Sequence, residues 1–183
     1  YEIMPSLVGS EMCIRDRSAK YRYTQRTASD RSICRTTETR NFMIEELIDL
    51  LHSGGYSCAI ANGDIIRTFT QRGVADLYDL LTQEPDFLKG ALIADKVVGK
   101  GAAALMILGG IKELHTDIIS SKALELFQDS DIKVSFIQEV PFIWNRDHTG
   151  WCPVETMCSE EKSAEAILPL IHNFLKRIRS GRK

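Results

Sequence analysis

The sequence lacks the marks of several large protein classes. No apolar run approaches the ~18 residues needed to span a bilayer, and no charged segment followed by a continuous apolar stretch opens the chain. The five cysteines are an odd number and include no Cys-x-x-Cys pair, which favours free thiols in a reducing compartment over a disulfide framework. We therefore expect a soluble, cytoplasmic protein with no membrane partner.

Basic charge is scarce in the part of the chain that has the patterns of a fold. Residues 1–42 carry 8 Lys and Arg against 5 Asp and Glu, whereas the remainder carries 15 against 20. Nucleic-acid binding normally needs a basic stripe on the folded domain, so we predict no nucleic-acid partner. A length of 183 residues with 44% hydrophobic residues is typical of one globular domain with a sizeable core.

Residues 1–42 do not read as part of that domain. Residues 5–17 resemble translated sequencing-adapter sequence, and the Arg-, Thr- and Ser-rich stretch that follows has no apolar period. We interpret 1–42 as an artefact or a disordered arm and Met43 as the first authentic residue. The alternative is a basic arm or a transit peptide, against which the acidic residues of the stretch count.

From Met43 onward the patterns alternate between helix and strand. Apolar residues at helical spacing predict a helix from Met43 to Gly54, and two β-branched runs joined by Asn62-Gly63-Asp64 predict an antiparallel hairpin. Further helices are predicted around Val74 to Leu81 and over 99–108, 121–127 and 164–179, and further strands over 90–94, 113–119 and 133–138. Such an alternation is typical of parallel strands with helical crossovers. We expect a domain over 43–160 and a carboxy-terminal amphipathic helix over 161–183.

Ligands of open α/β sheets bind beyond the carboxyl ends of the strands, where helices begin. That rule selects three stretches, 95–101, 120–122 and 145–155. In the first, Asp95, Lys96 and Lys100 are candidates for proton transfer, and Gly99 and Gly101 would let a ligand approach the backbone. The alternative is that both lysines are solvated and that the glycines only permit packing.

The other two stretches supply further candidates for the same cleft. Ser120 and Ser121 begin a helix, where Ser120 is most often a cap, while Arg146 and Glu155 would bind polar groups of a ligand. Cys152 is a candidate nucleophile with His148 as its nearest histidine in sequence, or else a half-buried structural thiol. The spacing of Cys152 and Cys158 is longer than in most zinc sites, so no metal site is predicted.

Six short segments between residues 43 and 158 resemble those of a known protein family. They are 56–58, 63–64, 72–74, 94–100, 118–120 and 152–155. Through them the chain resembles an uncharacterised bacterial and archaeal domain-of-unknown-function family placed in the cytidine-deaminase-like fold. The resemblance implies a three-layer α/β/α architecture with a mixed sheet of about five strands.

The resemblance does not extend to the zinc chemistry of that fold. Working deaminases bind zinc through a His-x-Glu or Cys-x-Glu motif at one helix start and a Pro-Cys-x-x-Cys motif at the next. The corresponding helix starts in this chain are Lys96–Lys100 and Ser120–Ala123. The expected ligands are absent at those positions, so we predict no cofactor and no zinc-dependent deamination. Our leading hypothesis is a metal-independent enzyme or binding domain for a small polar or anionic, nucleotide-like ligand. The alternative is an inactive interaction module that forms a homodimer through its last helix.

Overall fold

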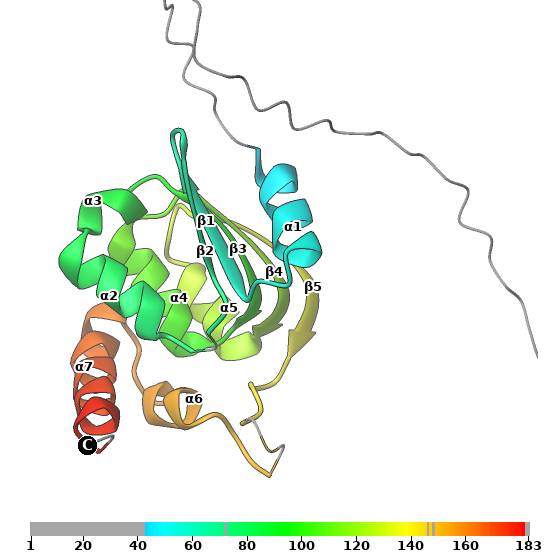
Figure 1. Cartoon of the computed structure of the whole chain (residues 1–183). Helices are drawn as coiled ribbons and strands as arrows, with labels where there is room; N and C mark the ends of the chain where they lie inside the picture. Colours follow the sequence, from blue (N-terminus) through cyan, green and yellow to red (C-terminus); the bar gives the residue numbers. More distant parts are fainter. Residues whose placement is uncertain (1–42, 72, 146, 148, 182–183) are drawn as a thin grey trace, which may run out of the picture. The chain divides into compact units, whose positions relative to one another are not determined.

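A five-stranded mixed sheet forms the centre of the fold (Figure 1). The computed structural model describes residues 43–71, 73–145, 147 and 149–181. The prediction for residues 1–42 therefore lies outside the described residues. The strands are β1 (Cys58–Asn62), β2 (Ile65–Phe69), β3 (Leu92–Val98), β4 (Glu113–Ser120) and β5 (Lys133–Val140). Their order across the sheet is β2-β1-β3-β4-β5, so the first strand of the hairpin, and not the second, lies beside β3.

The two halves of the sheet run differently. β1 is antiparallel to both β2 and β3, whereas β3, β4 and β5 are parallel to one another. The parallel half confirms the expectation drawn from the alternation of helices and strands, because parallel neighbours need long crossovers. The hairpin turns at Gly63, whose φ of 56° is one that glycine adopts without steric cost. The predicted α/β class with a mixed sheet is thus confirmed, while the cytidine-deaminase-like assignment stays a prediction.

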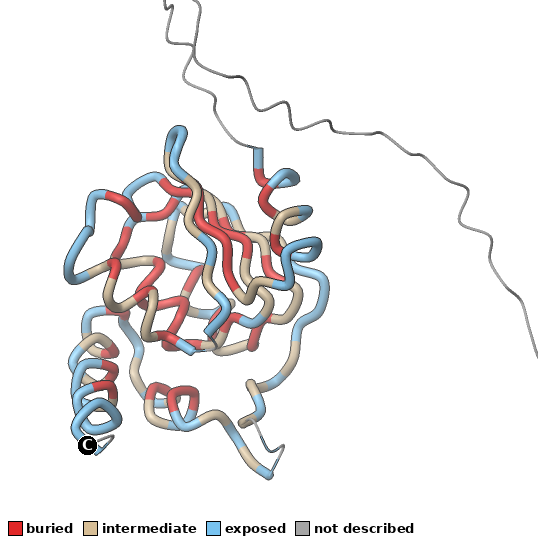
Figure 2. The backbone as a smooth tube through the Cα atoms, in the orientation of Figure 1, coloured by how far each residue is buried: buried red, intermediate tan, exposed pale blue. Residues whose placement is uncertain are grey.

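Helices cover the sheet unequally. Helix α1 (Ile44–Ser53) packs on one face, and α2 (Ala75–Gln83), α4 (Lys100–Gly109) and α5 (Ser121–Phe127) cover the other (Figure 1). Helix α4 begins directly after β3 and is buried along nearly its whole length, as Figure 2 shows in red. Its Ala and Gly residues allow this close packing because their side chains are small.

The remaining helices complete the layer around α4. They are α3 (Pro85–Leu88), α6 (Pro153–Cys158) and α7 (Ala164–Ser180). The apolar face of α7 contributes Ile167, Ile171 and Leu175 to the same core as the sheet and α4. The carboxy-terminal helix therefore completes the main core rather than standing apart from it.

Two hydrophobic clusters flank the sheet. The larger lies on the α4 face and includes Cys58, Ile93 and Leu114. The smaller lies under α1, where Leu47 and Leu51 pack on Ala59 and Ala94. None of the helices in the described part of the chain is long and apolar enough to cross a membrane.

Candidate functional site

Glu155 and Lys100, two of the predicted site residues, meet where helix α4 begins. Glu155, on α6, is 1% exposed, and its Oε2 accepts the backbone N–H of Lys100 at 2.8 Å. Backbone N–H groups at a helix start have no partner within the helix, and the helix dipole favours a negative charge there. The anion at the start of α4 is therefore the chain's own carboxylate.

The two glycines beside Lys100 make this contact possible. A β-carbon on Gly99 would collide with Glu155 Oε2, and one on Gly101 would collide with the Val154 side chain. A side chain at either position would therefore force the residues of α6 to shift. The alternative considered above, that these glycines permit packing, agrees with the structure.

The lysines near this junction bind the other end of α6. Lys100 is buried, and its Nζ donates to the backbone carbonyl of Ser159 at 2.9 Å. Lys122 Nζ lies 3.4 Å from the same oxygen and 5.6 Å from the centre of the Trp151 ring. Cations near a helix carboxyl end interact favourably with its free carbonyls. Lys100 is therefore hydrogen-bonded to the end of α6 and is not solvated.

Three groups at this junction remain chemically notable. Glu155 Oε1 is buried and accepts no hydrogen bond from the described residues. Burial and the Glu155 charge raise the pKa of the Cys158 thiol to about 11. Cys152 is half-buried at the residue that precedes α6, and it has no described histidine partner. The histidine expected to activate it, His148, lies outside the described residues.

Asp95 lies elsewhere, midway along β3. We predicted that the strand ends at Ala94, which is wrong, because β3 continues to Val98. Asp95 is directly opposite Cys58 in the antiparallel register of β1 and β3. Directly opposed residues share a face of the sheet, so Asp95 points, like Cys58, toward the α2 and α4 layer.

The Asp95 carboxyl is held in a low-polarity environment. Its Oδ1 accepts a hydrogen bond from the Val97 N–H at 3.0 Å, and the Cys58 thiol hydrogen-bonds to the carboxyl group. Burial raises the pKa of Asp95 to about 7, against the lowering effect of these hydrogen bonds. The residue as a whole is partly exposed. The folded chain therefore keeps Asp95 protonated to a higher pH than an ordinary aspartate.

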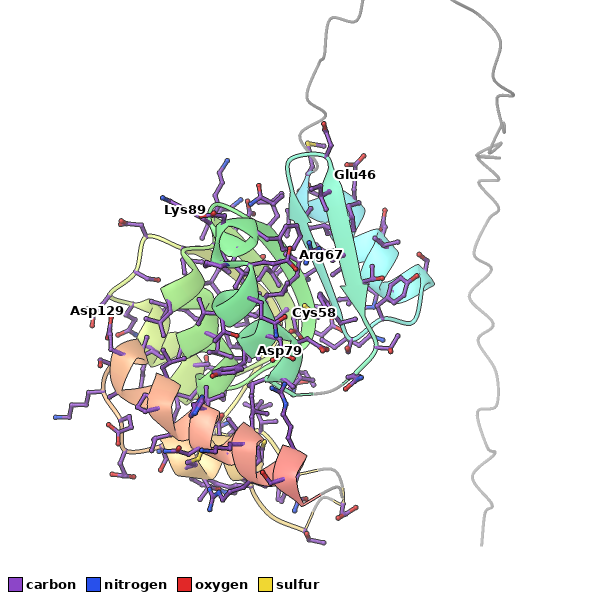
Figure 3. All side chains as sticks on the ribbon, turned by 60° about the vertical axis from the view of Figure 1, so that its left-hand side comes forward. Glu46, Cys58, Arg67, Asp79, Lys89 and Asp129 are labelled. Carbon is purple, nitrogen blue, oxygen red and sulfur yellow. The ribbon has the colours of Figure 1, made fainter. Side chains whose placement is uncertain are left out.

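Neighbouring acids and the thiol share this environment. Burial, followed by the charge of Asp95, raises the pKa of Cys58 well above its ordinary value. Asp76, in the first turn of α2, also acts on Cys58, and its own pKa is raised by burial and by Asp79. In Figure 3 Cys58 lies near the middle of the molecule, close to the boundary between the strands and the green helices. Cys58, Asp76 and Asp95 are called the acid cluster below.

Lys96 does not join Asp95. Successive strand residues alternate between faces, so Lys96 lies on the α1 side of the sheet. That side also carries His52 of α1 and Asp117 of β4. His52 Nε2 and Asp117 Oδ1 are 3.2 Å apart, and Asp117 Oδ1 has no hydrogen-bond partner among the described residues. Asp95 and Lys96, predicted to act together, thus face different helices.

The other predicted ligand-binding residues serve the start of α5 or cannot be placed. Ser120 is fully buried, and its Oγ accepts the Ala123 N–H at 3.2 Å, which makes it the N-cap. Ser121 donates to Glu139 Oε1 of β5 at 2.6 Å. Arg146 lies outside the described residues. The structure therefore does not bring Ser120 and Ser121 to the acid cluster.

Sequence reasoning missed three residues that the structure brings into these sites. The Ser159 carbonyl is the acceptor for Lys100 and lies 3.4 Å from the Lys122 amino group. Cys58 lies opposite Asp95, and Asp76 acts on Cys58 through its charge. Cys58 could have been found only by knowing that β1 lies between β2 and β3, which local patterns do not state. Among the described residues, no three His, Cys, Asp or Glu side chains lie close enough to hold a metal ion.

Comparisons with known proteins bear on the family. The family described as "TM1506: Domain of unknown function (DUF1893)" matches residues 46–175 of this chain. The crystal structure of the DUF1893 family protein TM1506 from Thermotoga maritima is similar, with a TM-score of 0.67 and 23% sequence identity. The alignment covers 80% of this chain and 99% of that chain, and at this identity it shows the fold alone. A comparison with curated proteins found no match. Since the family match spans most of the described fold, this chain belongs to the DUF1893 family.

Proposed function

We propose that this domain binds a small polar ligand at the acid cluster and exchanges a proton with it through Asp95. The observation that carries the proposal is the position of the Asp95 carboxyl, inside β3 and opposite Cys58, where β1, β3 and the start of α2 meet. A carboxyl at such a place costs stability when it is ionised. A domain that needs only a stable core would be better served by an apolar residue there.

Proton transfer is the chemistry that Asp95 suits best. General acids and bases work best when their pKa is near the working pH, and a pKa of about 7 meets that condition. The Val97 N–H donates to Oδ1 of the carboxyl, and the Cys58 thiol also hydrogen-bonds to the carboxyl. Perturbed carboxyls of this kind are concentrated at functional sites.

The charge of the acid cluster limits the part of the ligand that can meet it. Asp76 and Asp95 are both acids, and burial raises the pKa of each. An oxyanion placed beside them would be repelled, whereas an amine, an amide or a heterocyclic N–H would donate to them. The polar edge of a nucleobase-like ring has such donors, so a nucleotide-like ligand would approach through its base rather than its phosphate.

The alternative proposal, an interaction module that dimerises through α7, has less support. The residues of α7 that would form an apolar contact surface, Ile167, Ile171 and Leu175, are buried in the core of the same chain. Dimerisation through that face would require α7 to leave the core.

Ligand-dependent thermal unfolding of the full chain tests the proposal. Nucleosides, nucleobases and small amines are screened against the wild type, Asp95→Asn, and the control Asp129→Asn, whose exposed carboxyl lies in a loop. We expect at least one compound to raise the melting temperature of the wild type and the control but not of Asp95→Asn. Equal shifts in all three proteins would place the binding site elsewhere, and the absence of any shift across these classes would contradict the proposal.

A further inference from the structure

A hollow between helices α2 and α7 has the composition of a binding site, and no part of the proposed function involves it. Its volume is about 360 Å³, and it is lined by Tyr78, His172, Leu175, Lys176, Arg179 and Ser180. Small-molecule sites usually measure about 300 to 1,000 Å³, so the hollow suits a small ligand. Asp79, labelled in Figure 3, marks the place where α2 approaches α7, because it pairs with Arg179.

The charges around the hollow favour an anion. Arg179 is held by Asp79, with both carboxylate oxygens 2.8 Å from Nη2, so its position is fixed and its charge is matched. Lys176 has no side-chain partner among the residues that the structure describes, and it lies in the same wall. Lys176 is exposed, so its ammonium group is accessible to a ligand. One unmatched positive charge is suited to one negative charge.

Aromatic and aliphatic side chains also line the hollow. The Tyr78 hydroxyl and His172 Nδ1 are 2.6 Å apart, and the two ring centres are 6.0 Å apart. This hydrogen bond joins α2 to α7, and the buried Leu175 side chain lines the same hollow. Aromatic and aliphatic walls of this kind bind the apolar body of a ligand, and the polar groups set its orientation.

We propose that the α2 and α7 hollow binds a small oxyanion that carries an apolar group, with Lys176 contacting the oxyanion and Tyr78 and Leu175 contacting the apolar group. Phosphate esters and carboxylates share this chemistry. The proposal is independent of the acid cluster, since no residue of the hollow belongs to that cluster.

A chemical-shift titration of the full chain with four probes tests the proposal. The probes are phenyl phosphate, benzoate, benzyl alcohol and inorganic phosphate. We expect phenyl phosphate or benzoate to shift the amides around Lys176 and Ser180 and to bind more tightly than either benzyl alcohol or inorganic phosphate. The more effective of the two identifies the natural oxyanion as a phosphate or a carboxylate.

Two lysine variants test whether anion binding depends on the hollow or only on the positive charge of the protein surface. Lys176→Ala removes the unmatched cation, while Lys162→Ala removes an exposed lysine that lies before the start of α7. We expect the first variant to weaken binding of the anionic probe about tenfold and the second to leave it unchanged. Equal affinity in both variants, or no binding of either anionic probe at about 10 mM, would overturn the proposal.

Discussion

Glu155 and Lys100 are joined by a hydrogen bond of 2.8 Å between carboxylate and backbone N–H, although 55 positions separate them in the chain. Lys100 also reaches the far end of α6 through its amino group and the Ser159 carbonyl. A six-residue helix has little stability of its own, so its position depends on contacts of this kind. The residues that the sequence suggested as an anion site thus hold α6 against α4.

Substituting Gly101 tests this packing. Alanine in a helix interior is normally more favourable than glycine by about 1 kcal/mol. At Gly101 we expect the opposite, a loss of about 1 to 3 kcal/mol, because the new β-carbon would collide with Val154. Urea unfolding measures the change, and Gly150→Ala is the control because, apart from its chain neighbours, no described residue has an atom within 4 Å of its β-carbon position. A Gly101→Ala protein as stable as the wild type would show that α6 is not packed as described.

Substituting Glu155 tests the bond itself. Glu155→Ala leaves the Lys100 N–H buried without an acceptor, so we expect a loss of about 1 to 3 kcal/mol in the free energy of unfolding. Glu155→Gln keeps an acceptor oxygen and should lose less. Hydrogen exchange of the Lys100 amide provides a local readout that should accelerate in the alanine variant. If alanine and glutamine cost the same and the amide stays protected, Glu155 does not cap α4.

The raised pKa of Asp95 predicts how stability depends on pH. A carboxyl whose pKa rises from 3.8 to about 7 holds its proton more tightly in the folded chain than in the unfolded chain. The free energy of unfolding should therefore fall as pH rises from about 4 to about 7 and stay at the lower level above that range. Asn at position 95 cannot ionise, so the variant should lack this loss.

The difference between the two proteins isolates the effect of Asp95. We expect Asp95→Asn to match the wild type near pH 4 and to exceed it above pH 7 by up to about 4 kcal/mol, at about 1.36 kcal/mol for each pKa unit. Urea unfolding across this range measures the difference, and Asp129→Asn should show none. A stability difference that does not change with pH would mean that Asp95 is ionised throughout the range.

The described thiols should differ in reactivity. The pKa of Cys58 is raised by burial and that of Cys158 lies near 11, so neither should form thiolate readily at pH 8. Cys152 is only half-buried and should be alkylated by iodoacetamide first. Peptide mass spectrometry in a Cys13→Ser and Cys34→Ser background gives the order. Labelling of Cys58 as fast as Cys152 in the folded protein would contradict the buried position of Cys58.

Local patterns predicted most elements but not the extent of β3. The run Asp95-Lys96 looks like the start of a loop because charged residues are rare in central strands. The structure keeps both in the strand, with the Asp95 carboxyl hydrogen-bonded to Cys58 and Val97. The helices α3 and α6 are too short to show a helical period, so only their Pro residues mark them.

The acid cluster was only partly predictable for a related reason. Asp95 was identified from its place near a strand end, but its partner Cys58 depends on the order of strands in the sheet. A hairpin next to β3 could present either of its strands to β3, and the sequence does not distinguish the two arrangements. Contacts between distant residues, such as those of Glu155 and Ser159 with Lys100, depend in the same way on packing that local patterns do not encode.

An NMR titration of the Asp95 side-chain carboxyl carbon would show directly whether Asp95 exchanges a proton near neutral pH. The spectrum of Asp95→Asn identifies the Asp95 signal by its absence, and the wild type is then titrated from pH 4 to pH 9. We expect a midpoint near 7, well above the ordinary value of an aspartate. A midpoint below about 5 would contradict it, because Asp95 would then be an ordinary ionised carboxylate.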